Sequence, residues 1–115
     1  MRVKTHVARH RKKNRLRKAV KGSVGGRSKL LRTAIESMNR SMRFAYIGRK
    51  ERKRNFRRLW IERINAAARE RGMTYSALMG GLTKAGVEVD RRMMADLAVT
   101  DPGAFDRLVE VARQG

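Results

Sequence analysis

The second half of the chain repeats apolar residues every three or four positions, which is the spacing of one face of an α-helix. Phe56, Leu59, Ile64 and Ala67 follow this spacing, and Gly72 after them is typical of a helix end. The pattern predicts a helix that ends near residue 72.

Three further helices are predicted by the residues that begin them. Thr74 and Asp90 are of the types that cap helix N-termini, and apolar residues follow each at helical spacing. Asp101 and Pro102 predict the start of the last helix, because proline suits the first helical position. Gly86 marks the end of the helix that Thr74 opens. We expect the core of this region to contain Phe56, Leu59, Trp60, Ile64, Leu78, Leu82, Leu97, Phe105 and Leu108.

A long helix is predicted upstream of this region. Ser28 is a suitable N-cap, and no helix stop follows it until Gly72, with Gly48 as the expected kink. An apolar stripe at alternating spacings of four and three supports this helix, and it consists of Leu31, Ile35, Met38, Met42 and Ala45.

Residues 1–21 contain few apolar side chains and cannot form a core of their own, so in isolation we expect them to be disordered or at most a nascent helix. Gly22, Gly25 and Gly26 permit a bend before the long helix. No stretch alternates at the period of a β-strand, so the fold class is all-α. We expect a basic extended tail over residues 1–27, a long basic helix over 28–55 and a small globular helical domain over 56–115.

The charge divides the chain more sharply than the apolar pattern does. Residues 1–60 hold 22 Lys or Arg and only two acidic residues, whereas residues 61–115 hold eight of each sign. A net charge of +20 on 115 residues indicates a polyanionic partner. The chain has no cysteine, no apolar run of membrane-spanning length and no apolar signal-peptide segment after its basic start, so we expect a cytoplasmic protein.

Three kinds of partner suit a long basic helix. A coiled coil is disfavoured because Arg49 and Arg52 interrupt the apolar stripe, so no homo-oligomer is expected. A membrane surface is disfavoured because the arginines lie on several sides of the helix. Nucleic acid fits best, because binding phosphates releases condensed counterions and orders a flexible cationic segment.

RNA is favoured over DNA by the residue types present. Arginine outnumbers lysine more than two to one, which favours forked contacts with phosphates and stacking on bases of folded RNA. No helix-turn-helix, zinc-finger or zipper pattern is present. A basic nucleoid-type DNA-binding protein remains the alternative. The residues expected to bind RNA are Arg2, Lys4, His6, Arg9, His10, Arg11, Lys12, Lys13, Arg15, Lys18, Lys21, Gly22, Arg27, Ser28, Lys29, Arg32, Arg40, Arg43, Tyr46, Arg49, Lys50, Arg52, Lys53, Arg54, Asn55, Arg57 and Arg58.

The remaining side chains indicate no enzyme, cofactor or metal. His6 and His10 have a spacing that can hold a metal, but no third ligand is near, so contact with phosphate or a 2′-hydroxyl is the better interpretation. Tyr46 is left open between an RNA contact and packing on its own helix. No nucleophile, base and orienting group converge in the sequence.

The segment KRNFRRLWIERINAAARERG, residues 53–72, resembles the signature of the bacterial large-subunit ribosomal protein family numbered twenty. Further blocks that match in order are GRSK at 26–29, YSALMGGLTKAG at 75–86 and EVDRRMMADLAV at 88–99. Several blocks at compatible spacing make the resemblance specific, and it covers nearly the whole chain.

The resemblance implies a structural, non-enzymatic protein of the large ribosomal subunit. It implies a primary binder of 23S-type ribosomal RNA that acts early in assembly, with its basic extension threaded into the RNA. It also implies a bacterial or organellar ribosome, a neighbouring large-subunit protein numbered twenty-one, and, for some members, repression of their own messenger RNA.

Overall fold

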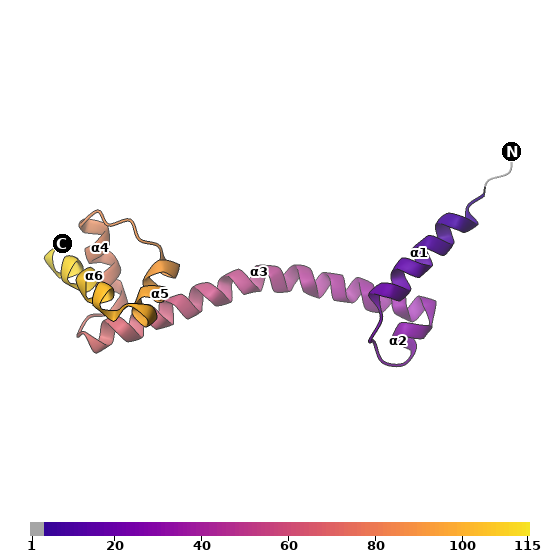
Figure 1. Ribbon diagram of the computed structural model, residues 1–115, viewed down its shortest axis with the longest axis horizontal. Helices are drawn as coiled ribbons and strands as arrows, with labels where there is room; N and C mark the ends of the chain where they lie inside the picture. Colours follow the sequence, from indigo (N-terminus) through magenta and orange to yellow (C-terminus); the bar gives the residue numbers. More distant parts are fainter. Residues whose placement is uncertain (1–3) are drawn as a thin grey trace. The chain divides into compact units, whose positions relative to one another are not determined.

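The structure is a computed structural model that describes residues 4–115, and this part of the chain consists of helices without strands (Figure 1). The all-α fold class is therefore confirmed. The helices are α1 (His6–Ala19), α2 (Gly26–Lys29), α3 (Leu31–Glu70), α4 (Tyr75–Lys84), α5 (Arg91–Thr100) and α6 (Pro102–Gln114). Within residues 4–115, none of these helices has the length and apolar character needed to cross a membrane.

The chain forms two compact units, Met1–Lys50 and Glu51–Gly115. We call the first the N-terminal unit and the second the C-terminal domain, and describe each by itself. The division falls within α3, whose second half, after Lys50, belongs to the C-terminal domain.

Each short helix of the C-terminal domain begins at the cap that the sequence predicts. The Thr74 hydroxyl accepts a hydrogen bond from the backbone N–H of Ala77 at 3.3 Å, and the Asp90 carboxylate accepts one from Met93 at 2.8 Å. Asp101 accepts from the Ala104 N–H at 3.0 Å. These bonds satisfy donors that a helix N-terminus leaves unpaired, so the three helix starts are confirmed.

Two glycines end α3 and α4 as expected. Gly72 and Gly86 have φ angles of 75° and 69°, a region that side chains with a Cβ rarely adopt. After Gly72, the N–H of Met73 donates to the carbonyl of Ala68, and the N–H of Gly72 donates to that of Arg69. The same pair of bonds follows Gly86, and this pattern is the Schellman motif that satisfies the last carbonyls of a helix.

The core of the C-terminal domain lies where α6 packs against α4 and α5 and the end of α3 joins them. Of the residues expected in it, Ile64, Leu78, Leu82 and Phe105 are buried, while Leu59, Trp60, Leu97 and Leu108 are partly buried. The core also includes Ala67, Ala68, Met94, Ala95, Val109 and Ala112.

The expectation that Phe56 belongs to this core is wrong. Its side chain is 51% exposed, whereas Trp60, one turn later, packs against the core. The helical spacing places Phe56 on the correct face of α3, but the buried core begins at Ile64, and Trp60 packs against it from the preceding turn. Periodicity identifies the apolar face of a helix, but it does not show how much of that face other helices bury.

One arginine of the C-terminal domain has a structural role. The Arg71 guanidinium lies 5.0 Å from the centre of the Phe105 ring and forms an ion pair with Asp106 on α6. It also donates a hydrogen bond to the carbonyl of Ala67 at 2.8 Å. Arg71 therefore fastens the end of α3 to α6, and only a fifth of its side chain is exposed.

The N-terminal unit is more helical than the sequence suggested. Residues 6–19, expected as part of an extended tail, form α1. Leu, Arg, Lys and Ala are good helix formers, and the segment contains no glycine or proline. No residue of α1 is buried, so its conformation rests on local propensity more than on packing.

The start of the long helix also differs from the expectation. Ser28 lies inside α2, where its hydroxyl donates to the Gly25 carbonyl at 3.1 Å, and it is not the N-cap of the long helix. Leu30 has an extended backbone, and α3 begins after it at Leu31. Gly25, with a φ of 66°, supplies the turn that separates α2 from the preceding loop.

Candidate nucleic-acid interface

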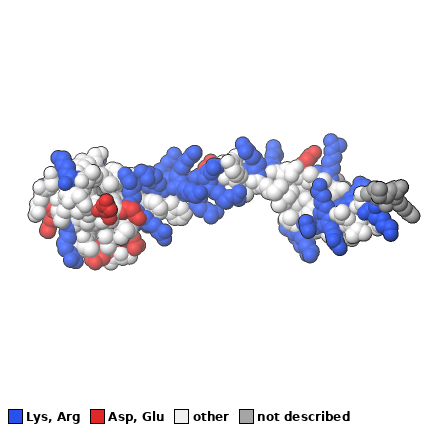
Figure 2. Space-filling view, turned by 90° about the horizontal axis from the view of Figure 1, so that it is seen from above, with Lys and Arg blue, Asp and Glu red and all other residues white. Residues whose placement is uncertain are grey.

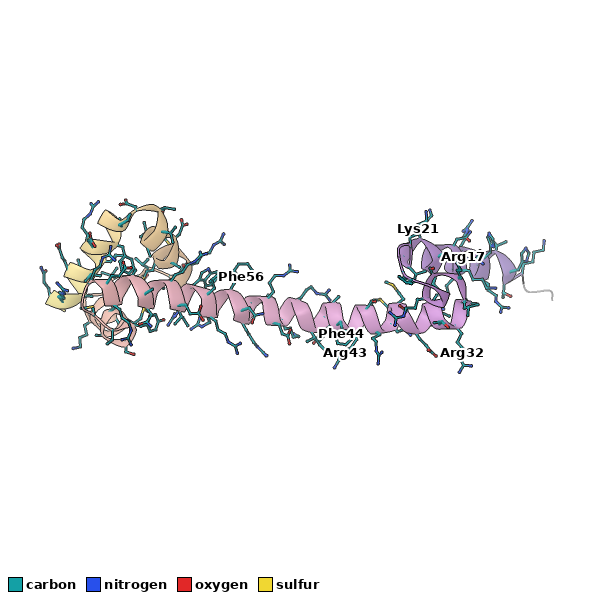
Figure 3. All side chains as sticks on the ribbon, turned by 90° about the horizontal axis from the view of Figure 1, so that it is seen from below. Arg17, Lys21, Arg32, Arg43, Phe44 and Phe56 are labelled. Atoms are coloured by element: carbon teal, nitrogen blue, oxygen red, sulfur yellow. The ribbon has the colours of Figure 1, made fainter. Side chains whose placement is uncertain are left out.

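The basic residues expected to bind RNA follow the chain from the loop before α1 to the middle of α3. Lys4 precedes α1, and the other members of the N-terminal unit lie on α1, the turn after it, α2 and the start of α3. All of the expected residues from Lys4 to Arg58 are exposed except Lys13 and Ser28, which are partly buried. Arg2 lies outside the described residues. Figure 3 shows Arg32 and Arg43 projecting outward from α3.

These positive charges are almost entirely unpaired within the chain. For the stretch from Lys4 to Arg58, the structure has one ion pair, in which Arg32 and Glu36 approach to 3.8 Å with both side chains largely exposed. Such a surface pair contributes little to stability. In Figure 2, Lys and Arg cover much of the surface, while Asp and Glu gather mainly on the C-terminal domain. Ion pairs within the described residues therefore relieve little of the repulsion among these cations.

The apolar stripe of the long helix faces α1. Leu31, Ile35, Met38 and Met42 line a groove of about 370 Å³ together with Leu16 of α1. The remaining lining residues are Arg9, Lys12, Lys13 and Asn39. In the described part of the N-terminal unit, only Val20 and Ala34 are buried apolar residues, so this contact does not amount to a stable core.

Tyr46 packs against its own helix. The Arg43 guanidinium lies 5.7 Å and the Lys50 ammonium 4.8 Å from the centre of its ring, at a distance typical of cation–π contacts. The side chain is still 48% exposed. This geometry favours packing on the helix, which was one of the two interpretations left open, and the RNA contact stays a prediction.

The histidines of α1 have no metal-like surroundings. His10 is hydrogen-bonded to the Asn14 side-chain amide at 3.0 Å, one turn away. Across residues 4–115, no group of three or more side chains of the metal-binding types gathers in one place.

Two residues near or on the basic surface, Arg92 and Phe44, were missed by the sequence reasoning. Arg92 of α5 lines a groove with Arg52, Arg57 and Phe56 of α3, so a cation from the charge-balanced half joins the basic half. Phe44 is 64% exposed beside Arg40 in a polar groove of the N-terminal unit. The pair Arg91-Arg92 within a block of the resemblance was the available signal for Arg92, and no periodic pattern marked Phe44.

Over residues 4–115, helices whose basic side chains are exposed and almost entirely unpaired are typical of the class of nucleic-acid-binding proteins. Comparison with known proteins identifies the family within this class. The family described as "Ribosomal protein L20" matches residues 2–108. The chain belongs to this family.

Similar proteins cover the chain almost from end to end. It is 55% identical over 114 residues to the large ribosomal subunit protein bL20 of Thermomicrobium roseum, with 99% of this chain and 97% of that protein aligned. It is 51% identical over 113 residues to bL20 of Lawsonia intracellularis, covering 98% and 97% of the two chains. For bL20 of Moorella thermoacetica the identity is 50% over 113 residues, with 98% and 93% covered. The family consists of structural proteins, so the chain is not an enzyme.

Proposed function

We propose that the chain is a structural constituent of the large ribosomal subunit in the bacterial cytoplasm and binds 23S-type ribosomal RNA directly, early in assembly. One observation carries this proposal: residues 1–50 have 17 Lys or Arg against one Glu, and the described ones contain a single exposed ion pair. Relatives named as large-subunit proteins support the ribosomal setting.

The binding mechanism we propose couples order to phosphate contact. Free in solution, the N-terminal unit has only Val20 and Ala34 buried among its described residues, which is too little to offset the entropy lost on ordering. On RNA, each Lys or Arg that neutralises a phosphate releases condensed counterions. The guanidinium groups of arginine add paired hydrogen bonds to phosphate oxygens. The RNA would therefore complete the fold of this unit.

The division of labour between tail, long helix and domain also belongs to the proposal. Residues 1–27 and 28–55 would supply affinity by phosphate contact, and the charge-balanced remainder would supply a rigid shape that recognises one RNA junction. The expected neighbour is the large-subunit protein numbered twenty-one. A messenger RNA that folds like the ribosomal site would bind the same surface, and this would allow the chain to repress its own synthesis.

Chemical footprinting of large-subunit ribosomal RNA tests this function. We expect the full chain, at moderate salt, to protect nucleotides concentrated at one junction and along one adjoining path, because a rigid domain fixes the register of the basic segment. A duplex DNA of equal length serves as the control. Protection spread evenly over the RNA, with equal affinity for the DNA, would instead support a nucleoid-type DNA-binding protein.

A further inference from the structure

The exposed ring of Phe56 is the feature of the C-terminal domain that packing does not explain. A phenylalanine that is 51% exposed on a helix rich in arginine leaves apolar surface in water. The ring centres of Phe56 and Trp60 lie 6.3 Å apart, with the planes tilted by 40°. Trp60 packs against the core, so the half-exposed Phe56 ring lies beside an anchored aromatic side chain.

A groove of about 590 Å³ surrounds this ring. Its lining combines two aromatic side chains with four cations and contains no acidic residue: Arg52, Lys53, Phe56, Arg57, Trp60 and Arg92. Three of the cations come from α3, and Arg92 comes from α5, so the groove exists only when the domain is folded. All six residues belong to the C-terminal domain.

We propose that this groove, here called the Phe56 cleft, binds one unpaired nucleotide of RNA with its base stacked on the Phe56 ring. Aromatic side chains stack on the faces of bases that have left a helix, and surrounding arginines hold the flanking phosphates. A base inside a duplex cannot reach the ring, because its faces are already covered by its neighbours. The inference rests on the proposed function and deepens it, because it names the kind of nucleotide that this part of the protein selects.

The four cations decide against an apolar protein partner in the Phe56 cleft. Covering the cleft with an apolar helix would desolvate Arg52, Lys53, Arg57 and Arg92 without providing any countercharge. A nucleotide has a flat base that can stack on the Phe56 ring and a phosphate that can pair with the four cations. The charge and the aromatic face therefore complement the same ligand.

Substitutions at Phe56 in the full chain test the proposal on a transcript of large-subunit ribosomal RNA. We expect Phe56→Ala to weaken binding by about tenfold, within the range measured when a stacking aromatic is replaced by alanine. Phe56→Tyr should bind like the unchanged chain, and Phe56→Leu should bind like Phe56→Ala, because leucine is apolar but has no stacking face. Val99→Ala, which removes part of another exposed apolar side chain, is the matched control and should have no effect.

The dependence on salt separates stacking from charge. Phe56→Ala removes no cation and should leave the slope of log affinity against log salt unchanged, whereas Arg92→Gln should reduce that slope by about one. Equal affinities for Phe56→Ala and the unchanged chain, or for Phe56→Leu and Phe56→Tyr, would overturn the proposal. Circular dichroism and thermal unfolding of each variant would show whether the helical domain is retained.

Trp60 provides a readout that does not depend on the ribosomal site. It is the only tryptophan of the chain and lines the Phe56 cleft, so a bound base should quench its fluorescence. We expect a short single-stranded RNA to quench Trp60 in the unchanged chain, a duplex RNA of the same length to quench it far less, and Phe56→Ala to lose the difference. Equal quenching by both RNAs would contradict the inference. Failure to prefer ribosomal RNA over duplex DNA would instead contradict the proposed function.

Discussion

Replacing Gly81 with alanine will destabilise the C-terminal domain by about 3 kcal/mol or more, near the upper limit for overpacking a core. Gly81 is buried in α4 where that helix meets α6. A Cβ at this position would lie 2.7 Å from the carbonyl carbon and 2.8 Å from the Cα of Ala112. Carbon atoms pack at about 3.5–4.0 Å, and the obstacle is backbone, so α6 would have to move away from α4.

The neighbouring glycine is the matched control for this prediction. Gly80 lies in the same helix and has no atom within 4 Å of the position its Cβ would take. We expect Gly80→Ala to stabilise the domain by about 0.5–1 kcal/mol, because alanine is the better helix former. Urea unfolding followed by Trp60 fluorescence measures both changes. Similar stabilities for the two variants would show that α4 and α6 do not approach as closely as described.

Removing residues 1–50 will lower the affinity for ribosomal RNA at about 0.1 M salt by at least roughly a thousandfold. This segment carries a net charge of +16, whereas residues 51–115 carry +4. If about eight of its cations contact phosphates, its loss will reduce the slope of log affinity against log salt by roughly six to seven. Filter binding over a range of salt concentrations measures both quantities.

The shortened chain should still fold and should keep its choice of RNA. Its core residues all lie between Ile64 and Ala112, and the caps and helix ends around them are complete without the N-terminal unit. Binding to the ribosomal junction and to a duplex RNA of equal length forms the control pair. An unchanged salt slope after truncation would contradict the separation of affinity from recognition.

The C-terminal domain was predictable in detail because its signals are local. The Thr74, Asp90 and Asp101 caps and the Gly72 and Gly86 stops each act within a few residues, so the sequence states them directly. The charge division was equally visible. These two features were enough to predict an all-α, nucleic-acid-binding protein.

The Phe56 cleft was not predictable, because it depends on tertiary packing. Phe56 has the same helical spacing as buried residues, and only the positions of the short helices leave it exposed. Arg92 of α5 lines the groove together with Arg57 of α3, although 35 positions separate the two residues in the sequence. Apolar and charged patterns along the chain identify the faces of single helices, whereas this site is formed by residues of two different helices in the folded domain.

The N-terminal unit differed from expectation for a related reason. The sequence indicated one helix start at Ser28, whereas the extended backbone of Leu30 separates the short α2 from α3. In α1, good helix propensity favours the helix, and repulsion among many like charges opposes it. The sequence alone does not show which of the two effects is larger. Neighbouring phosphates would remove that repulsion, which makes the balance dependent on the partner.

Hydrogen exchange of the backbone amides tests most directly whether RNA completes the N-terminal unit. In the free protein at about 0.15 M salt, we expect the amides of α1 to exchange within roughly a hundredfold of the rate of an unfolded chain, and those of α4 and α6 to exchange far more slowly. Adding the ribosomal RNA fragment should slow exchange in α1 while leaving α6 nearly unchanged. Amides of α1 that are already as protected as those of α6 without RNA would contradict the account.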